Sequence, residues 1–171
     1  MDVDQVENDN KDADNTLETV ALFITQYIQS TSTSVRKELY QLLPFFCQFV
    51  GNETGQEVSQ TCLKSLCYLS VCITPKSSID FVLEMIWKVS QSSSWKAKMS
   101  ILEFAQTFVF TNFMSLCQHE IYVGKIEALV IEMMSDVTLQ VRQKATKILC
   151  GLFHSQFIDN EGQARLLKVS F

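Results

Sequence analysis

The sequence has few of the residues that interrupt helices. Only 5 glycines and 2 prolines occur in 171 residues, although 47% of the residues are hydrophobic. Short strands joined by tight turns need more glycine and proline than this, because these residues supply the backbone conformations of such turns. The composition therefore favours a helical protein that is able to bury a core.

Long apolar runs are also absent. No stretch of ~18 or more residues lacks charged or strongly polar side chains, as a membrane-spanning helix would require. Residues 1–15 are acidic and almost free of apolar side chains, whereas a signal peptide begins basic and continues apolar. We expect residues 1–15 to form a disordered acidic tail, and the protein to be neither secreted nor bound to a membrane.

The sequence shows no pattern of metal ligands or catalytic residues. The 6 cysteines lie in apolar stretches without a Cys-x-x-Cys motif, and we interpret them as reduced thiols that pack as small hydrophobic side chains. The 2 histidines, His119 and His154, lie in different predicted helices. We therefore expect no enzymatic activity, no metal and no cofactor. The net charge of −5 and the scattered basic residues also argue against direct nucleic-acid binding.

Apolar residues repeat at three- and four-residue steps along most of the chain, which is the spacing of amphipathic helices. Ser34 is a suitable N-cap for the second helix, Gly51 ends it, and Pro44 inside it predicts a bend. Short polar turns separate the later helices. The predicted helices cover residues 16–30, 34–50, 55–73, 78–90, 95–114, 119–135 and 138–154.

Parts of the sequence repeat internally. Val35 and Arg36 follow a short turn, and they match Val141 and Arg142, which follow a turn of the same length. A weaker third copy has Trp95 at this position. Such repeats are typical of HEAT and armadillo arrays, so we predict an all-α solenoid of about seven antiparallel helices over residues 16–171. A compact bundle stays open as the alternative, because the helix 55–73 has no obvious partner.

The last copy of the repeat indicates what its residues do. Asp136 lies where its carboxylate can accept hydrogen bonds from free backbone amides or pair with an arginine of a neighbouring unit. Val141 is expected to fill the seam between the paired helices, and Arg142 to point towards the stack. These residues, with Val35 and Arg36, are the predicted structural residues of the repeat.

Aromatic residues concentrate around the third copy. Phe104, Phe108, Phe110 and Phe113 are spaced as a packed interior face, and we prefer this interpretation to a ligand site. Trp87 and Trp95 flank one interhelical turn and are expected to hold that helix pair together. Either tryptophan would become a candidate contact for a partner if it were exposed.

Several stretches resemble one known family. They are Trp95 with the serine before it, the aromatic-rich segment 102–113, and the segments 136–145 and 149–153. Residues 95–157 resemble the C-terminal region of the large, ATP-independent HEAT-repeat proteasome activators. The resemblance implies a partner of the 20S proteasome core particle that opens its gate, has no protease site and promotes degradation without ubiquitin or ATP. It also implies a location in the nucleus and cytoplasm.

Family members contain a bromodomain-like segment, which is associated with acetylated histones in DNA repair and spermatogenesis. The matching positions here are Gln156 and Phe157, where the family has Asn before Phe. Gln156 retains a carboxamide that can donate a hydrogen bond to an acetyl carbonyl, although its longer side chain moves the donor. The resemblance thus predicts acetyl-lysine binding at Gln156 and Phe157.

Family members end in a tail with a penultimate tyrosine that docks on the proteasome ring, whereas this sequence ends in Val169, Ser170 and Phe171. We expect either a fragment or shortened member of the family, or a member that lacks the docking residue. The alternative function is a generic helical-repeat adaptor that binds a peptide or helix in its groove and makes no contact with the proteasome.

Overall fold

The computed structural model describes residues 35–50 and 56–158 without gaps, and every regular element in these ranges is a helix. Nine further residues between 15 and 30 are described, and all nine are helical, in the region of the predicted helix 16–30. The predicted acidic tail before Asn15 and the part of the predicted domain after Ile158 lie outside the described residues.

Residues 35–50 and 56–158 hold one 3₁₀ helix and seven α-helices. No helix among the described residues combines the length and apolar character needed to cross a membrane. The helix bounds are η1 Lys37–Leu42, α2 Leu43–Phe49, α3 Gln56–Ser70, α4 Lys76–Ser90, α5 Trp95–Thr111, α6 Phe113–Cys117, α7 Glu120–Met134 and α8 Leu139–His154.

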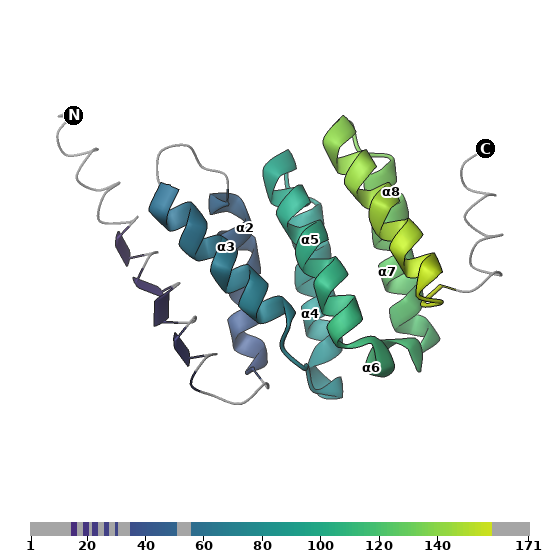
Figure 1. The fold of residues 1–171 in the computed structure, drawn as a ribbon, viewed down its shortest axis with the longest axis horizontal. Coiled ribbons are helices and arrows are strands. Elements are labelled where there is room, and N and C mark those ends of the chain that lie inside the picture. Colours follow the sequence, from purple (N-terminus) through teal and green to yellow (C-terminus); the bar gives the residue numbers. More distant parts are fainter. Residues whose placement is uncertain are drawn as a thin grey trace.

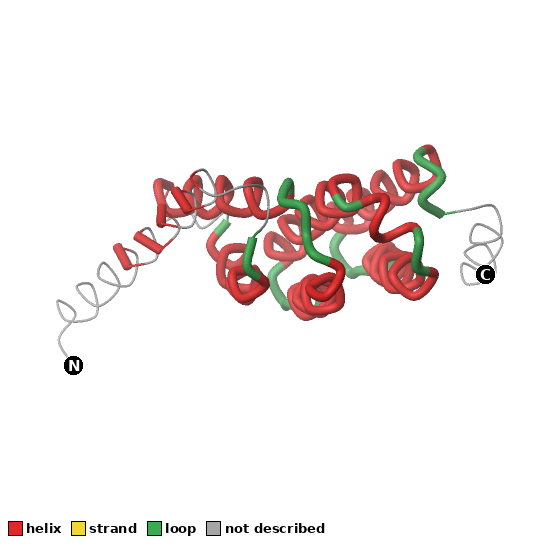
Figure 2. Tube along the Cα trace, turned by 90° about the horizontal axis from the view of Figure 1, so that it is seen from below, coloured by secondary structure: helices red, strands yellow, loops and turns green. Residues whose placement is uncertain are grey.

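The helices form three stacked pairs. Helix α2 packs on α3, α4 on α5 and α7 on α8, and each pair packs on the next. Figure 1 shows α3, α5 and α8 side by side in front of α2, α4 and α7, and Figure 2 shows the two layers from below. The predicted all-α, HEAT-like solenoid is thus confirmed. We call the contact between the α2–α3 and α4–α5 pairs the first interface, and the contact between the α4–α5 and α7–α8 pairs the second interface.

The first interface is centred on aromatic rings. The Tyr40 ring of η1 lies edge-on to Phe104 and Phe108 of α5, with ring centroids 6.3 and 6.5 Å apart. The side chains of Tyr40 and Phe108 are fully buried. The Tyr40 hydroxyl lies 3.0 Å from the hydroxyl of Thr74, so its polar group is satisfied inside the core. Burial raises the pKa of Tyr40 to about 12.

Asn112 divides the predicted helix 95–114 into α5 and α6. Its buried side chain accepts a 2.7 Å hydrogen bond from the Thr74 amide, and donates to the carbonyl oxygens of Cys72 and Phe108 at 3.2 and 3.1 Å. These bonds join the end of α5 to the loop between α3 and α4. The helix is therefore interrupted by a tertiary contact that helical periodicity could not reveal.

Pro44 divides the predicted helix 34–50. The chain forms the 3₁₀ helix η1 first and becomes α-helical at Leu43, so Pro44 lies in the first turn of α2. Proline is tolerated there because the first-turn amides of a helix have no intrahelical acceptor. The residue predicted to bend a helix thus marks the start of a new one.

The helix that lacked a partner in the sequence, α3, packs on α2. Because α2 lies in the same layer as α4 and α7, it corresponds to the first helix of each pair (Figure 2). The sequence repeat had matched Val35 and Arg36 with Val141 and Arg142, which belong to the second helix of a pair. That alignment is wrong by one helix, since the local pattern of Val-Arg after a turn does not distinguish the two layers.

Candidate binding groove

Trp87 lies outside the buried face of α4. The buried apolar residues of this helix recur at three- and four-residue steps and face the core, and they are Ile79, Val82, Leu83, Ile86 and Val89. Trp87 follows Ile86 and falls at the edge of this face, where its side chain is 42% exposed. Trp95 is equally exposed, at 42%. The two tryptophans were predicted to hold the helix pair together, but a large part of each side chain is exposed instead of packed. Both therefore meet the condition for a contact with a partner.

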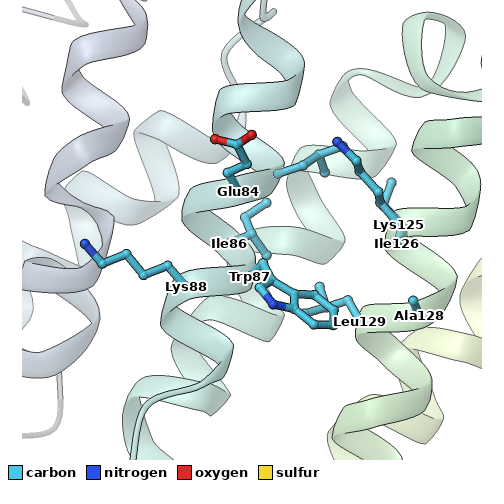
Figure 3. Close-up of a pocket in the computed structure, with 9 residues that line it drawn as sticks. Glu84, Ile86, Trp87, Lys88, Lys125, Ile126, Ala128 and Leu129 are labelled. Carbon is cyan, nitrogen blue, oxygen red and sulfur yellow. The ribbon is translucent and has the colours of Figure 1, made fainter.

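A groove of about 610 Å³ lies between α4 and α7, next to Trp87. In Figure 3 the indole ring lies between the two helices, beside Leu129, and the Lys125 side chain extends from α7 towards α4. The lining residues are Leu83, Glu84, Ile86, Trp87, Lys88, Lys125, Ile126, Ala128 and Leu129. The floor is apolar and the charged groups lie at the rim, so the groove is suited to apolar side chains of a partner.

Polar bridges join α4 and α7 near both ends of the groove. At one end, Asp80 accepts a 2.6 Å hydrogen bond from Lys125 and a 3.2 Å bond from the Tyr122 hydroxyl. At the other end, the Gln91 side chain donates to Glu132 at 3.0 Å. The hydrogen bond from Lys125 lowers the pKa of Asp80, against a smaller opposing effect of burial. These bridges hold α4 and α7 side by side while the space between them stays open.

Sequence reasoning missed most of the groove. It named Trp87 but not Leu83, Lys125 or Leu129, because two helices 40 residues apart must be placed side by side before the groove exists. One signal was present: α7 is apolar on nearly all sides, with Ile121 at 72% exposed. A helix of this kind is usually covered on more than one side.

The structure places Asp136 in the second interface. Its carboxylate accepts a 2.6 Å hydrogen bond from Lys98 of α5 and a 2.7 Å bond from the amide of Thr138. The Asp136 side chain is 4% exposed. Burial alone would raise the pKa of Asp136, but the bonds from Lys98 and Thr138 outweigh it and lower the pKa. The partner in the neighbouring pair is thus a lysine, where the sequence suggested an arginine.

The other four predicted repeat residues lie in two separate parts of the fold. Val141 is fully buried in α8. Arg142 turns back to its own loop and donates to the carbonyl oxygens of Asp136 and Val137 at 2.9 and 3.0 Å. Val35 is buried near η1, and Arg36 is the exposed residue before η1. The five residues therefore do not form one site.

Gln156 and Phe157 form the C-terminal cap of α8. Gln156 has a φ of 59°, and the Phe157 amide donates to the carbonyl oxygen of Leu152 at 3.0 Å. This is the left-handed turn that commonly ends helices, usually with glycine at the position of Gln156. The Phe157 ring is 3% exposed and lies edge-on to Phe113, with centroids 5.5 Å apart. Only the Gln156 side chain is exposed to solvent, and neither residue lines the groove.

The buried thiols are held in the protonated form. Burial raises the pKa of Cys47 to about 12 and that of Cys62 to about 11. A thiol with such a pKa is a poor nucleophile at neutral pH, because only the thiolate attacks. Within the described ranges, no three His, Cys, Asp or Glu side chains come together in a way that could hold a metal ion.

Comparison with known proteins gives one consistent result. No protein-family model matches this chain. Human proteasome activator complex subunit 4 is 32% identical over 133 residues, or 76% of this chain, and subunit 4B of Danio rerio is 31% identical over the same length. Subunit 4A of Danio rerio is 31% identical over 147 residues, or 83% of this chain. The chain belongs to the proteasome activator complex subunit 4 family.

The family predicted from the sequence is therefore confirmed. The chain spans only 7 to 8% of the length of these relatives. A match of this extent relates one helical region of a subunit 4 protein to this chain. The match does not by itself show that this chain has the partners or the activity of a whole activator.

Proposed function

We propose that this chain is a non-catalytic module of a proteasome activator, which binds the 20S core particle and promotes degradation that needs neither ubiquitin nor ATP. The sequence relationship to proteasome activator complex subunit 4 over 76% of the chain carries this proposal. The solenoid supports it, because stacked helix pairs offer extended surfaces for a large protein partner. We further propose that the chain acts in the nucleus and cytoplasm.

Binding and activation are tested with purified components. The full chain is titrated into 20S core particle, complex formation is followed on native gels, and hydrolysis of a fluorogenic peptide is recorded on the same samples. We expect co-migration with the core particle and faster hydrolysis that saturates with added chain. A chain heated to loss of helicity serves as the control. If neither co-migration nor faster hydrolysis occurs, the proposal is refuted and the generic adaptor becomes the better description.

Acetylated histones are the proposed substrate class that follows from the family. The proposal rests on the exposed carboxamide of Gln156, since the Phe157 ring packs on Phe113. Binding of an acetylated histone tail peptide is compared with that of its unacetylated form, for the wild-type chain and for Gln156→Ala. Equal affinity for the two peptides would exclude acetyl-lysine recognition by this chain.

A further inference from the structure

The exposed sides of α4 and α7 are suited to pair with the same helices of a second copy in antiparallel orientation. Glu84 and Lys88 lie one turn apart on α4, on either side of Ile86, and both line the rim of the groove. Among the described residues neither takes part in an ion pair. Ile86 itself is buried, whereas Glu84 and Lys88 are exposed. Two antiparallel copies of α4 whose exposed sides cross at the level of Ile86 would set Glu84 of each copy opposite Lys88 of the other. The rim is therefore complementary in charge to a second copy of the same chain.

Helix α7 fits the same arrangement. Ala128 lies level with Ile86, because Asp80 contacts Lys125 on one side of this level and Gln91 contacts Glu132 on the other. Ala128 is small and exposed, and one turn away a side chain added at Gly124 would meet no atom within 4 Å. Two copies of α7 can thus approach closely where they cross. In this register no like charges face each other on either helix.

We propose that two copies of this chain associate face to face through α4 and α7, around a two-fold axis that passes beside Ile86 and Ala128. In each chain the exposed Trp87 side chain lies between α4 and α7 (Figure 3). In the dimer the two grooves face each other, and the two Trp87 side chains fill the space between them. The groove of each copy is thus filled by the indole of Trp87 from the other copy, with Glu84 and Lys88 of that copy on either side of it. This proposal does not depend on proteasome binding.

The expected association is weak. Helices α4 and α7 have 15 residues each, so together they offer a surface about 22 Å long and about 20 Å wide. That is roughly 450 Å² per chain, about half of the ~800 Å² per partner in a stable complex. The dimer should therefore form reversibly with a dissociation constant in the range of roughly 10 to 100 μM.

The charge pattern allows a sharp test by sedimentation velocity of the full chain at roughly 5 to 300 μM, a range that spans the expected constant. Glu84→Lys and Lys88→Glu each replace two attractive pairs by two repulsive ones, and each should weaken the dimer about tenfold or more. The double variant exchanges the two charges and should restore the dimer. A mixture of the two single variants should form a heterodimer, because each then supplies the charge that the other needs.

Trp87→Ala should abolish the dimer over this range, and Trp95→Ala is the matched control, since both tryptophans are 42% exposed. Circular dichroism confirms that each variant keeps the helicity of the wild type. Three results would overturn the proposal: a wild-type chain that stays monomeric throughout, a dimer that persists in Trp87→Ala, or a double variant that dimerises no better than the single ones. A monomeric wild type would leave the groove to a different protein.

Discussion

The two interfaces of the stack join similar helix pairs by different chemistry. The first interface buries the rings of Tyr40, Phe104 and Phe108 and satisfies its few polar groups internally. The second interface is crossed by polar bridges between Asp80 and Lys125 and between Lys98 and Asp136, and it leaves the groove open between α4 and α7. An interface packed with aromatic rings leaves no surface for a partner between two pairs, whereas a bridged interface can hold two pairs together and still present one.

The largest expected difference between the two interfaces is the cost of removing a phenylalanine ring. Helix α5 allows a direct test, because it contributes one phenylalanine to each interface. Phe108 of α5 is fully buried against Tyr40, whereas Phe110 of the same helix is 41% exposed near Gly151 of α8. We expect Phe108→Ala to lower the free energy of unfolding by about 3–5 kcal/mol, because it leaves a cavity in the core. Phe110→Ala should lower it by less than about 1.5 kcal/mol. Urea unfolding followed by circular dichroism measures both, and equal losses would contradict the comparison.

The polar centre of the first interface is the next test. Asn112→Ala removes the hydrogen-bond partners of the Thr74 amide and the Cys72 carbonyl, which stay buried. An unsatisfied buried group is costly, so we expect a loss of about 2–3 kcal/mol in the free energy of unfolding. Gln118→Ala, at an exposed helix end, is the control and should change stability by less than about 0.5 kcal/mol. Hydrogen exchange at Thr74 should also accelerate in Asn112→Ala, and unchanged exchange would argue against this role.

The second interface should be the acid-sensitive one. The pKa of Asp136 is lowered in the folded state, so its stabilising effect is complete above the ordinary pKa near 3.8 and is lost as the pH falls through the lowered value. We expect Asp136→Asn to lower the free energy of unfolding by about 1–2 kcal/mol at pH 7. At pH 3 the difference between variant and wild type should shrink. Thermal unfolding at both pH values measures this, and a difference that does not depend on pH would rule out a role of the charge.

The smallest effect is expected outside both interfaces, at the end of α8. Gln156 has a φ of 59°, a conformation that glycine adopts without strain and that glutamine rarely adopts. We expect Gln156→Gly to raise the free energy of unfolding by about 0.5–1 kcal/mol. Gln118→Gly is the matched control, since Gln118 ends α6 with a φ of −72° and should gain nothing. A stabilisation of both variants would show that the strain at Gln156 is not its source.

Much of the fold could be predicted from the sequence because helical periodicity is local. The predicted helix 138–154 differs from α8 by one residue, and the predicted helix 119–135 differs from α7 by one residue at each end. The helix 34–50 and the helix 95–114 were predicted as single elements and are each divided. The division at Asn112 depends on hydrogen bonds to a loop some 40 residues away, which no local pattern contains.

The candidate site was predictable only in part, for the same reason. Trp87 could be singled out as an aromatic residue beside a turn, but its exposure depends on how α4 packs. Phe157 was predicted as part of a ligand site, and the structure packs its ring on Phe113 at the cap of α8. A sequence motif records which residues are adjacent in the chain, and it cannot show which side chains remain accessible after packing.

The sequence by itself determined the helices, the all-α class and the family, since these follow from the spacing of apolar residues and from identities along the chain. Tertiary structure decided how the helices pair, where the two interfaces differ and that a groove opens between α4 and α7. The physical reason is that burial belongs to pairs of surfaces. The apolar side of α5 is closely packed where it faces Tyr40. Between α4 and α7, polar bridges hold the two helices side by side and a groove stays open.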